Sequence, residues 1–80
     1  MARRNRKQTP YVEARWSDAL EGFHVWVEPS GEHREVTGNY CEDRLPEIAA
    51  ALLGTPVEIT RWIKADDEGG DGFRYEPARP

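Results

Sequence analysis

Residues 43–63 read DRLPEIAAALLGTPVEITRWI, and this stretch decides the fold because a helical pattern passes directly into a strand pattern. Asp43 is expected to cap a helix over residues 44–53, since its carboxylate can accept hydrogen bonds from the free amides of the first turn. Apolar residues recur there every three or four positions, on one side of the helix: Leu45, Ile48, Ala49 and Leu52. After Gly54, apolar and polar residues alternate over residues 57–64, which predicts a strand with one buried face.

Two further strands are predicted upstream, over residues 11–17 and 23–28, because apolar residues there also alternate with polar ones. Antiparallel pairing in a hairpin keeps all their apolar side chains on one face when three pairs form: Trp16 with Phe23, Ala14 with Val25, and Val12 with Val27. A shift of one residue would destroy this match. The sequence therefore specifies the register of the hairpin.

A third strand is expected over residues 32–37, after the turn signal Pro29-Ser30-Gly31. Pairing Val25 with Val36 would put Val36 on the buried face. The predicted fold class is α+β: a small antiparallel β-meander of three strands, one short helix packed on one face, and then a fourth strand. This order, over about residues 11–64, resembles that of the HicB-like antitoxin domains. The resemblance rests on element order and carries no functional residues across.

Composition divides the chain into three segments. Residues 1–10 carry four basic and no acidic residues and are predicted to form a disordered arm. Residues 11–64 are predicted to form the single α/β domain, with five basic and ten acidic residues. Residues 65–80 are acidic and glycine-rich and are predicted to be a flexible tail, with a docking motif at Phe73 and Tyr75 as the alternative.

Eighty residues bury a small core, so self-association as a homodimer would add useful buried area. The single cysteine excludes a disulfide within the chain and favours a reducing compartment. No run of apolar residues is long enough to span a membrane, and we expect a soluble, cytoplasmic protein. Arginine outnumbers lysine nine to two, which is typical of GC-rich genomes such as those of actinobacteria and their phages.

The sequence contains no motif that predicts an enzyme. It lacks a glycine-rich phosphate loop, a GxSxG nucleophile elbow and an HExxH metal motif. His24, His33 and Cys41 are candidates for metal ligands or for a nucleophile–base pair, but a lone cysteine near a turn is more often structural. We therefore expect no catalytic residues, no cofactor and no metal site.

A helix on one side of the sheet would leave the other face uncovered, and aromatic residues gather there in the predicted pattern. The predicted partner-binding residues on that face are Tyr11, His24, Trp26, His33 and Trp62. Tryptophan and tyrosine are enriched in interface hot spots. Two alternatives stay open: Arg15 and the two tails shield Trp26, or the last strand twists so that Trp62 meets the core.

Two functions follow as hypotheses. The first is a small non-enzymatic protein-interaction module, such as a regulator, inhibitor or assembly factor, that binds a protein partner or itself through the uncovered sheet face. The alternative is a nucleic-acid-associated protein whose N-terminal arm contacts phosphates through Arg3, Arg4, Arg6 and Lys7. The net charge of −4 and the acidic body oppose strong nucleic-acid binding, so this contact would be weak.

Overall fold

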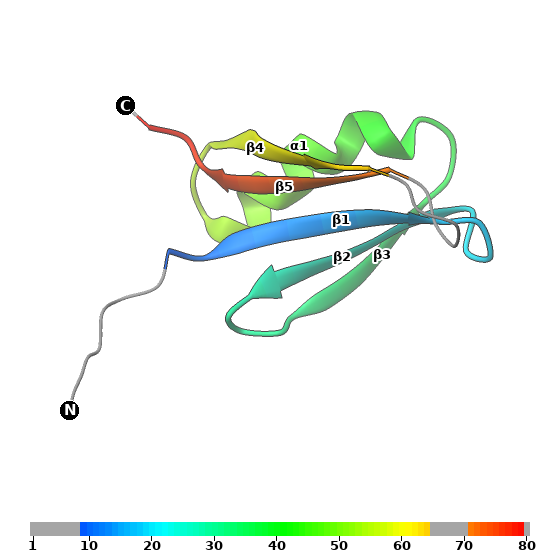
Figure 1. Ribbon diagram of the computed structural model, residues 1–80, viewed down its shortest axis with the longest axis horizontal. Helices are drawn as coiled ribbons and strands as arrows, with labels where there is room; N and C mark the ends of the chain where they lie inside the picture. Colours follow the sequence, from blue (N-terminus) through cyan, green and yellow to red (C-terminus); the bar gives the residue numbers. More distant parts are fainter. Residues whose placement is uncertain (1–8, 65–70, 80) are drawn as a thin grey trace.

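In the described part of the chain, five antiparallel strands form one sheet, and one helix lies across one of its faces (Figure 1). The computed structural model describes residues 9–64 and 71–79. The elements are β1 (Tyr11–Ser17), β2 (Gly22–Glu28), β3 (His33–Thr37), α1 (Cys41–Leu53), β4 (Val57–Ile63) and β5 (Gly72–Pro77). The strand order is β3-β2-β1-β5-β4, and α1 contacts all five strands. The α+β class is therefore confirmed, with five strands rather than four.

The β1–β2 hairpin has the predicted register. Trp16 lies opposite Phe23, Ala14 opposite Val25 and Val12 opposite Val27. The pairing of β3 differs from the prediction by two residues, because Val36 lies opposite Phe23 instead of Val25. The turn between β2 and β3 is tight, since the Val27 amide donates to the Glu32 carbonyl at 2.8 Å. A shift of two positions keeps the same face, so Val36 is still buried against the helix.

The prediction that residues 65–80 form a flexible tail is wrong for residues 72–77. These residues form β5, which lies inside the sheet between β1 and β4 (Figure 1). Phe73 pairs with Ala14 and Tyr75 pairs with Val12, and both aromatic side chains are buried. Residues 65–70 lie outside the part that the structure describes. The alternation of Phe73 and Tyr75 with charged residues was the available signal, but the acidic glycine-rich stretch before it suggested disorder.

The helix begins earlier than predicted, at Cys41 instead of residue 44. Its N-cap is Tyr40, in a left-handed conformation and without a side-chain cap, so Asp43 lies within the first turn and is not the cap. Pro46 consequently lies inside the helix, where its nitrogen cannot donate to the carbonyl of Glu42. The predicted end is confirmed, because Gly54 adopts a φ of 74° that a side chain would disfavour.

The core fills the space between α1 and the covered face of the sheet. Leu45 of the helix and Val12 and Val25 of the central strands are fully buried. The rest of the buried cluster comprises Ala14, Phe23, Val27, Val36, Cys41, Ala49, Phe73 and Tyr75. Every strand except β4 contributes a buried residue to this cluster. β4 lies at an edge of the sheet, and most of its side chains are exposed.

A β-bulge in β4 changes which side chains face the helix. Ile59 pairs with Tyr75, but the next paired residue is Arg61, opposite Arg74. Thr60 is thus an extra residue, and the alternation of the strand reverses after it. Trp62 consequently pairs with Phe73 on the covered face, whereas Ile63 lies on the other face, opposite Gly72. The prediction that Trp62 lies on the uncovered face is therefore wrong.

The basic arm falls largely outside the described residues, since the structure describes the chain only from Thr9 onwards at this end. Its four basic residues, Arg3, Arg4, Arg6 and Lys7, all belong to the part that is not described. Within residues 9–64 and 71–79, no helix combines the length and apolar character needed to cross a bilayer.

Candidate partner-binding site

Four of the five predicted partner-binding residues share the sheet face that α1 leaves uncovered, which we call the open face. Tyr11 comes from β1, His24 and Trp26 from β2, and His33 from β3. Trp26 pairs with Glu13 on one side and with His33 on the other. The fifth residue, Trp62, is not part of this group, because the bulge turns it toward the helix side.

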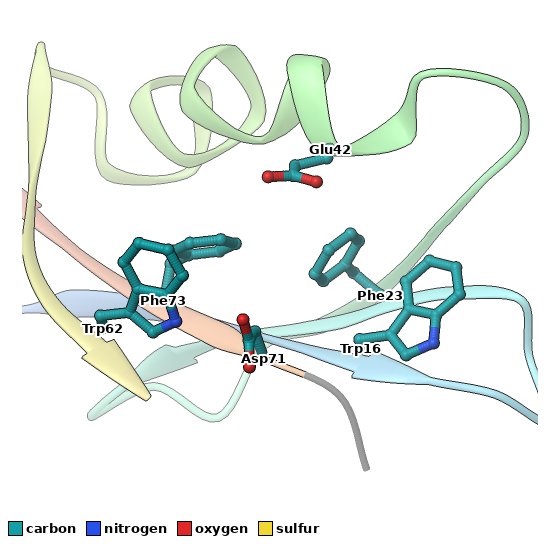
Figure 2. Close-up of a pocket in the computed structure, with 6 residues that line it drawn as sticks. All are labelled: Trp16, Phe23, Glu42, Trp62, Asp71 and Phe73. Atoms are coloured by element: carbon teal, nitrogen blue, oxygen red, sulfur yellow. The ribbon is translucent and has the colours of Figure 1, made fainter. Parts of the chain in front are cut away.

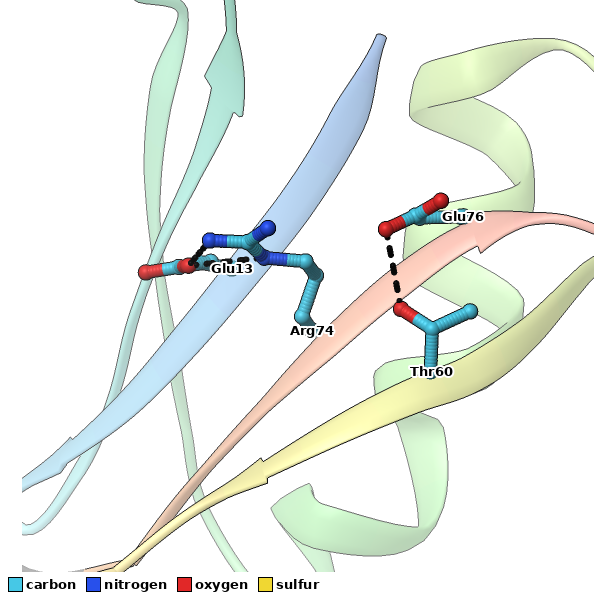
Figure 3. A network of polar contacts seen from close by, with 4 residues as sticks. All are labelled: Glu13, Thr60, Arg74 and Glu76. Carbon is cyan, nitrogen blue, oxygen red and sulfur yellow. Dashed lines mark hydrogen bonds and ion pairs between the residues drawn. The ribbon is translucent and has the colours of Figure 1, made fainter. Parts of the chain in front are cut away.

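Side chains of the open face mostly contact one another. The Nη2 and Nε atoms of Arg74 donate to Glu13 Oε2 at 2.6 and 3.0 Å (Figure 3). The Arg74 guanidinium also lies over the Tyr11 ring, 4.0 Å from its centroid. His24 Nδ1 lies 3.2 Å from His33 Nε2, and Trp26 is half-buried. A partner on this face would have to replace contacts that already exist.

The Glu13–Arg74 pair supports a prediction about stability. The hydrogen bond that Arg74 donates to Glu13, partly opposed by burial, raises the pKa of Arg74 above its ordinary value. Glu13 itself is 8% exposed, so Arg74→Met would leave a buried carboxylate without its partner. We expect a loss of about 2 to 3 kcal/mol in the free energy of unfolding at pH 7. The double variant Glu13→Leu/Arg74→Met should recover at least half of this loss in urea melts. A double variant no more stable than Arg74→Met would contradict the pairing argument.

A second surface lies on the helix side, where aromatic rings surround a hollow of about 420 Å³ (Figure 2). We call it the aromatic hollow, and it is lined by Trp16, Phe23, Glu42, Trp62, Asp71 and Phe73. Figure 2 shows Trp16 and Phe23 on one side, Trp62 and Phe73 on the other, and Glu42 projecting from the start of α1. Four strands and the helix therefore contribute to one concave site.

The hollow has a buried floor and exposed walls. Phe23 and Phe73 are buried, with ring centroids 6.4 Å apart. The Trp16 ring meets Phe23 edge-on at 5.3 Å, and the Trp62 ring lies 5.7 Å from Phe73. Trp62 is 63% exposed and Trp16 is half-buried. The interplanar angles of 76° and 54° mean that the two tryptophans stand as walls against the floor instead of stacking flat upon it.

Local contacts orient the walls of the hollow. Trp16 Nε1 donates to Asp18 Oδ1 at 2.7 Å, which orients the indole. The Trp16 backbone amide donates to the Asp71 carbonyl at 3.2 Å, which ties the beginning of β5 to β1. The bulge at Thr60 directs Trp62 toward the same space, and Thr60 Oγ1 donates to Glu76 Oε2 at 3.0 Å (Figure 3). Because its indole is already oriented, Trp16 would lose little conformational entropy on binding.

Tyr75, next to this site, is expected to set the alkaline limit of stability. Burial and, less strongly, the charge of Glu42 raise its pKa from 10.0 to about 12. Above pH 10 the phenol therefore ionises in the unfolded chain while it stays protonated in the folded one, so stability falls as pH rises from 10 to 12. This contribution amounts to about 2 to 3 kcal/mol.

The measurement compares urea unfolding near pH 9 and pH 12 for the wild type and for Tyr75→Phe. Because phenylalanine cannot ionise, the variant should lose about 2 to 3 kcal/mol less than the wild type between the two values. Tyr40→Phe, at an exposed tyrosine, is the matched control and should behave like the wild type. Equal losses for wild type and Tyr75→Phe would contradict the assignment.

Sequence reasoning identified part of this hollow, but not as a site. Trp16 and Phe23 were predicted on the covered face as core residues, and Trp62 was predicted on the wrong face. Phe73 was predicted to belong to a flexible tail, with a docking motif at Phe73 and Tyr75 as the alternative. No pattern in the sequence indicated Glu42 or Asp71, because their proximity to the rings depends on the helix start and on β5.

Comparisons with protein-family models, with curated proteins and with solved structures find no match. The resemblance in element order to the HicB-like antitoxin domains gains no support from them, and β5 adds a strand to that order. In the part of the chain that the structure describes, no three or more His, Cys, Asp or Glu residues are arranged to hold a metal ion.

Proposed function

We propose that this protein is a small non-enzymatic interaction module that binds a protein partner through the aromatic hollow. The observation that carries the proposal is the exposure of Trp62 above a floor of buried rings. A tryptophan at 63% exposure leaves a large apolar area in water, and such residues are enriched in interface hot spots. The protein would act by occupying a surface, as a regulator, inhibitor or assembly factor does.

The hollow supports this function better than the open face does. On the open face, Arg74 engages both Glu13 and Tyr11, and the two histidines contact each other. On the helix side, Trp62 and Ile59 are exposed apolar residues on an edge strand. Edge strands and exposed apolar patches are common sites of protein association. A protruding side chain of the partner would enter the hollow, with the rest of the partner lying along β4.

Affinity capture tests the proposal with the full chain as bait. Immobilised wild-type protein is expected to retain a partner from a lysate of the source cell, and Trp26→Ala should retain the same protein. Trp62→Ala should not. Loss of the partner with Trp26→Ala and its retention with Trp62→Ala would move the site to the open face and refute the proposal.

A second copy of the chain is the other occupant to consider, since β4 has a free edge. Sedimentation over a range of protein concentrations separates the two cases. We expect a monomer at all concentrations, because the bulge and the charged residues Glu58 and Arg61 interrupt the edge of β4. A concentration-dependent dimer that Trp62→Ala abolishes would identify the partner as a second copy.

A further inference from the structure

We propose that the aromatic hollow recognises a cationic side chain of the partner, a lysine ammonium or an arginine guanidinium. This inference rests on the proposed function and adds the chemistry of the group that enters. It comes from two features of the same site: aromatic walls, and carboxylates beside them.

The ring arrangement suits a cation. Trp16 and Trp62 are the two tryptophans of the lining, and tryptophan offers the strongest cation–π attraction of the aromatic side chains. The rings differ in orientation, with Trp16 edge-on to Phe23 and Trp62 tilted by 54° to Phe73. A group that enters the hollow would meet several rings of different orientation instead of a single stacked surface. Cages of this kind bind alkylated ammonium groups in other proteins.

The carboxylates beside the rings favour a cationic occupant of the hollow over an apolar one. Glu42 and Asp71 line the hollow together with the four rings, and among the residues that the structure describes no basic side chain does so. An apolar occupant would remove water from the Glu42 carboxylate and offer it no partner, which opposes binding. A cation would offer the exposed Glu42 carboxylate an ion pair. Within residues 9–64 and 71–79, Glu42 has no ion pair that a ligand would have to break.

The wider charge distribution favours the same occupant. The whole chain carries a net charge of −4, and residues 11–64 carry twice as many acidic as basic residues. A negative surface potential attracts basic segments and repels acidic ones before contact is made. The expected partner therefore presents a lysine or arginine from a basic region of its surface.

NMR titration of the full chain tests the inference with defined probes. The ligands are N-acetyl-lysine methylamide and N-acetyl-arginine methylamide, with N-acetyl-norleucine methylamide as an uncharged analogue of the lysine compound. The readout is the indole N–H signals of Trp16, Trp26 and Trp62. We expect the cationic probes to shift the Trp16 and Trp62 signals and to bind about 5- to 10-fold more tightly than norleucine.

Two variants locate the source of the preference. Glu42→Gln should remove most of the advantage of lysine over norleucine, whereas Glu47→Gln, the same change on the same helix but outside the lining, should preserve it. Norleucine binding as tightly as lysine at the same indoles would overturn the inference but leave an apolar-side-chain pocket, consistent with the proposed function. Absence of shifts at Trp16 and Trp62 with every probe would also overturn it. The proposed function itself fails only if the partner does not contact the hollow.

Discussion

Truncation of the chain after Gly70 is expected to leave it unfolded. The truncation removes β5, which pairs with β1 on one side and β4 on the other. Loss of the buried rings of Phe73 and Tyr75 alone should cost about 3 to 5 kcal/mol each. Natural domains are stable by only about 5 to 15 kcal/mol, and small domains lie at the lower end. Circular dichroism should show no cooperative thermal transition.

Truncation after Ala78 is the matched control, because it keeps β5 and the hydrogen bond from the Ala78 amide to the Pro56 carbonyl. The chain cut after Ala78 should melt cooperatively, at a temperature close to that of the full chain. A cooperative transition in the chain cut after Gly70 would mean that residues 11–64 fold alone, and would contradict the central position of β5.

Trp62→Ala is expected to weaken binding of the purified partner by at least about 30-fold while the protein stays folded. The loss follows from removal of one wall of the hollow and corresponds to about 2 kcal/mol, the lower limit for an interface hot spot. Because Trp62 is 63% exposed, its removal should change the free energy of unfolding by about 1 kcal/mol or less. Isothermal titration calorimetry gives the affinity, and thermal melts give the stability.

Trp26→Ala provides the comparison on the open face. It makes the same substitution on the opposite side of the sheet and should change the partner affinity by no more than about threefold. If Trp26→Ala weakens binding as strongly as Trp62→Ala does, the hollow is not the principal contact. A large drop in the melting temperature of Trp62→Ala would instead show that its ring supports the fold.

The β1–β2 hairpin and the end of the helix could be predicted because local patterns determine them. Three apolar pairs admit one register, and Gly54 provides the positive φ that ends α1. The face of β3 was also predictable, although its pairing differed by two residues, because alternation fixes the face and not the position along the neighbouring strand.

The position of Trp62 could not be derived from alternation. Strict period two holds only while each residue of β4 has one partner, and the bulge at Thr60 breaks this condition. No glycine or proline within β4 marks the bulge. The possibility that the last strand twists Trp62 toward the core was the closest that sequence reasoning came.

The place of β5 was hidden for a related reason. Its apolar alternation covers only Phe73 and Tyr75, and it follows a stretch typical of disorder. Gly72, which added to that impression, is required by packing: a Cβ there would lie 2.6 Å from the carbonyl oxygen of Ala14. The aromatic hollow depends on both β5 and the bulge, so the sequence could supply its residues but not their assembly.

The most direct test of the account compares two NMR spectra of the ¹⁵N-labelled chain, one recorded with its partner and one without. The chain has three tryptophans, and their indole N–H signals report on both candidate surfaces at once. The account predicts that the Trp16 and Trp62 signals shift or broaden while the Trp26 signal stays in place. A change confined to Trp26 would contradict it and place the partner on the open face.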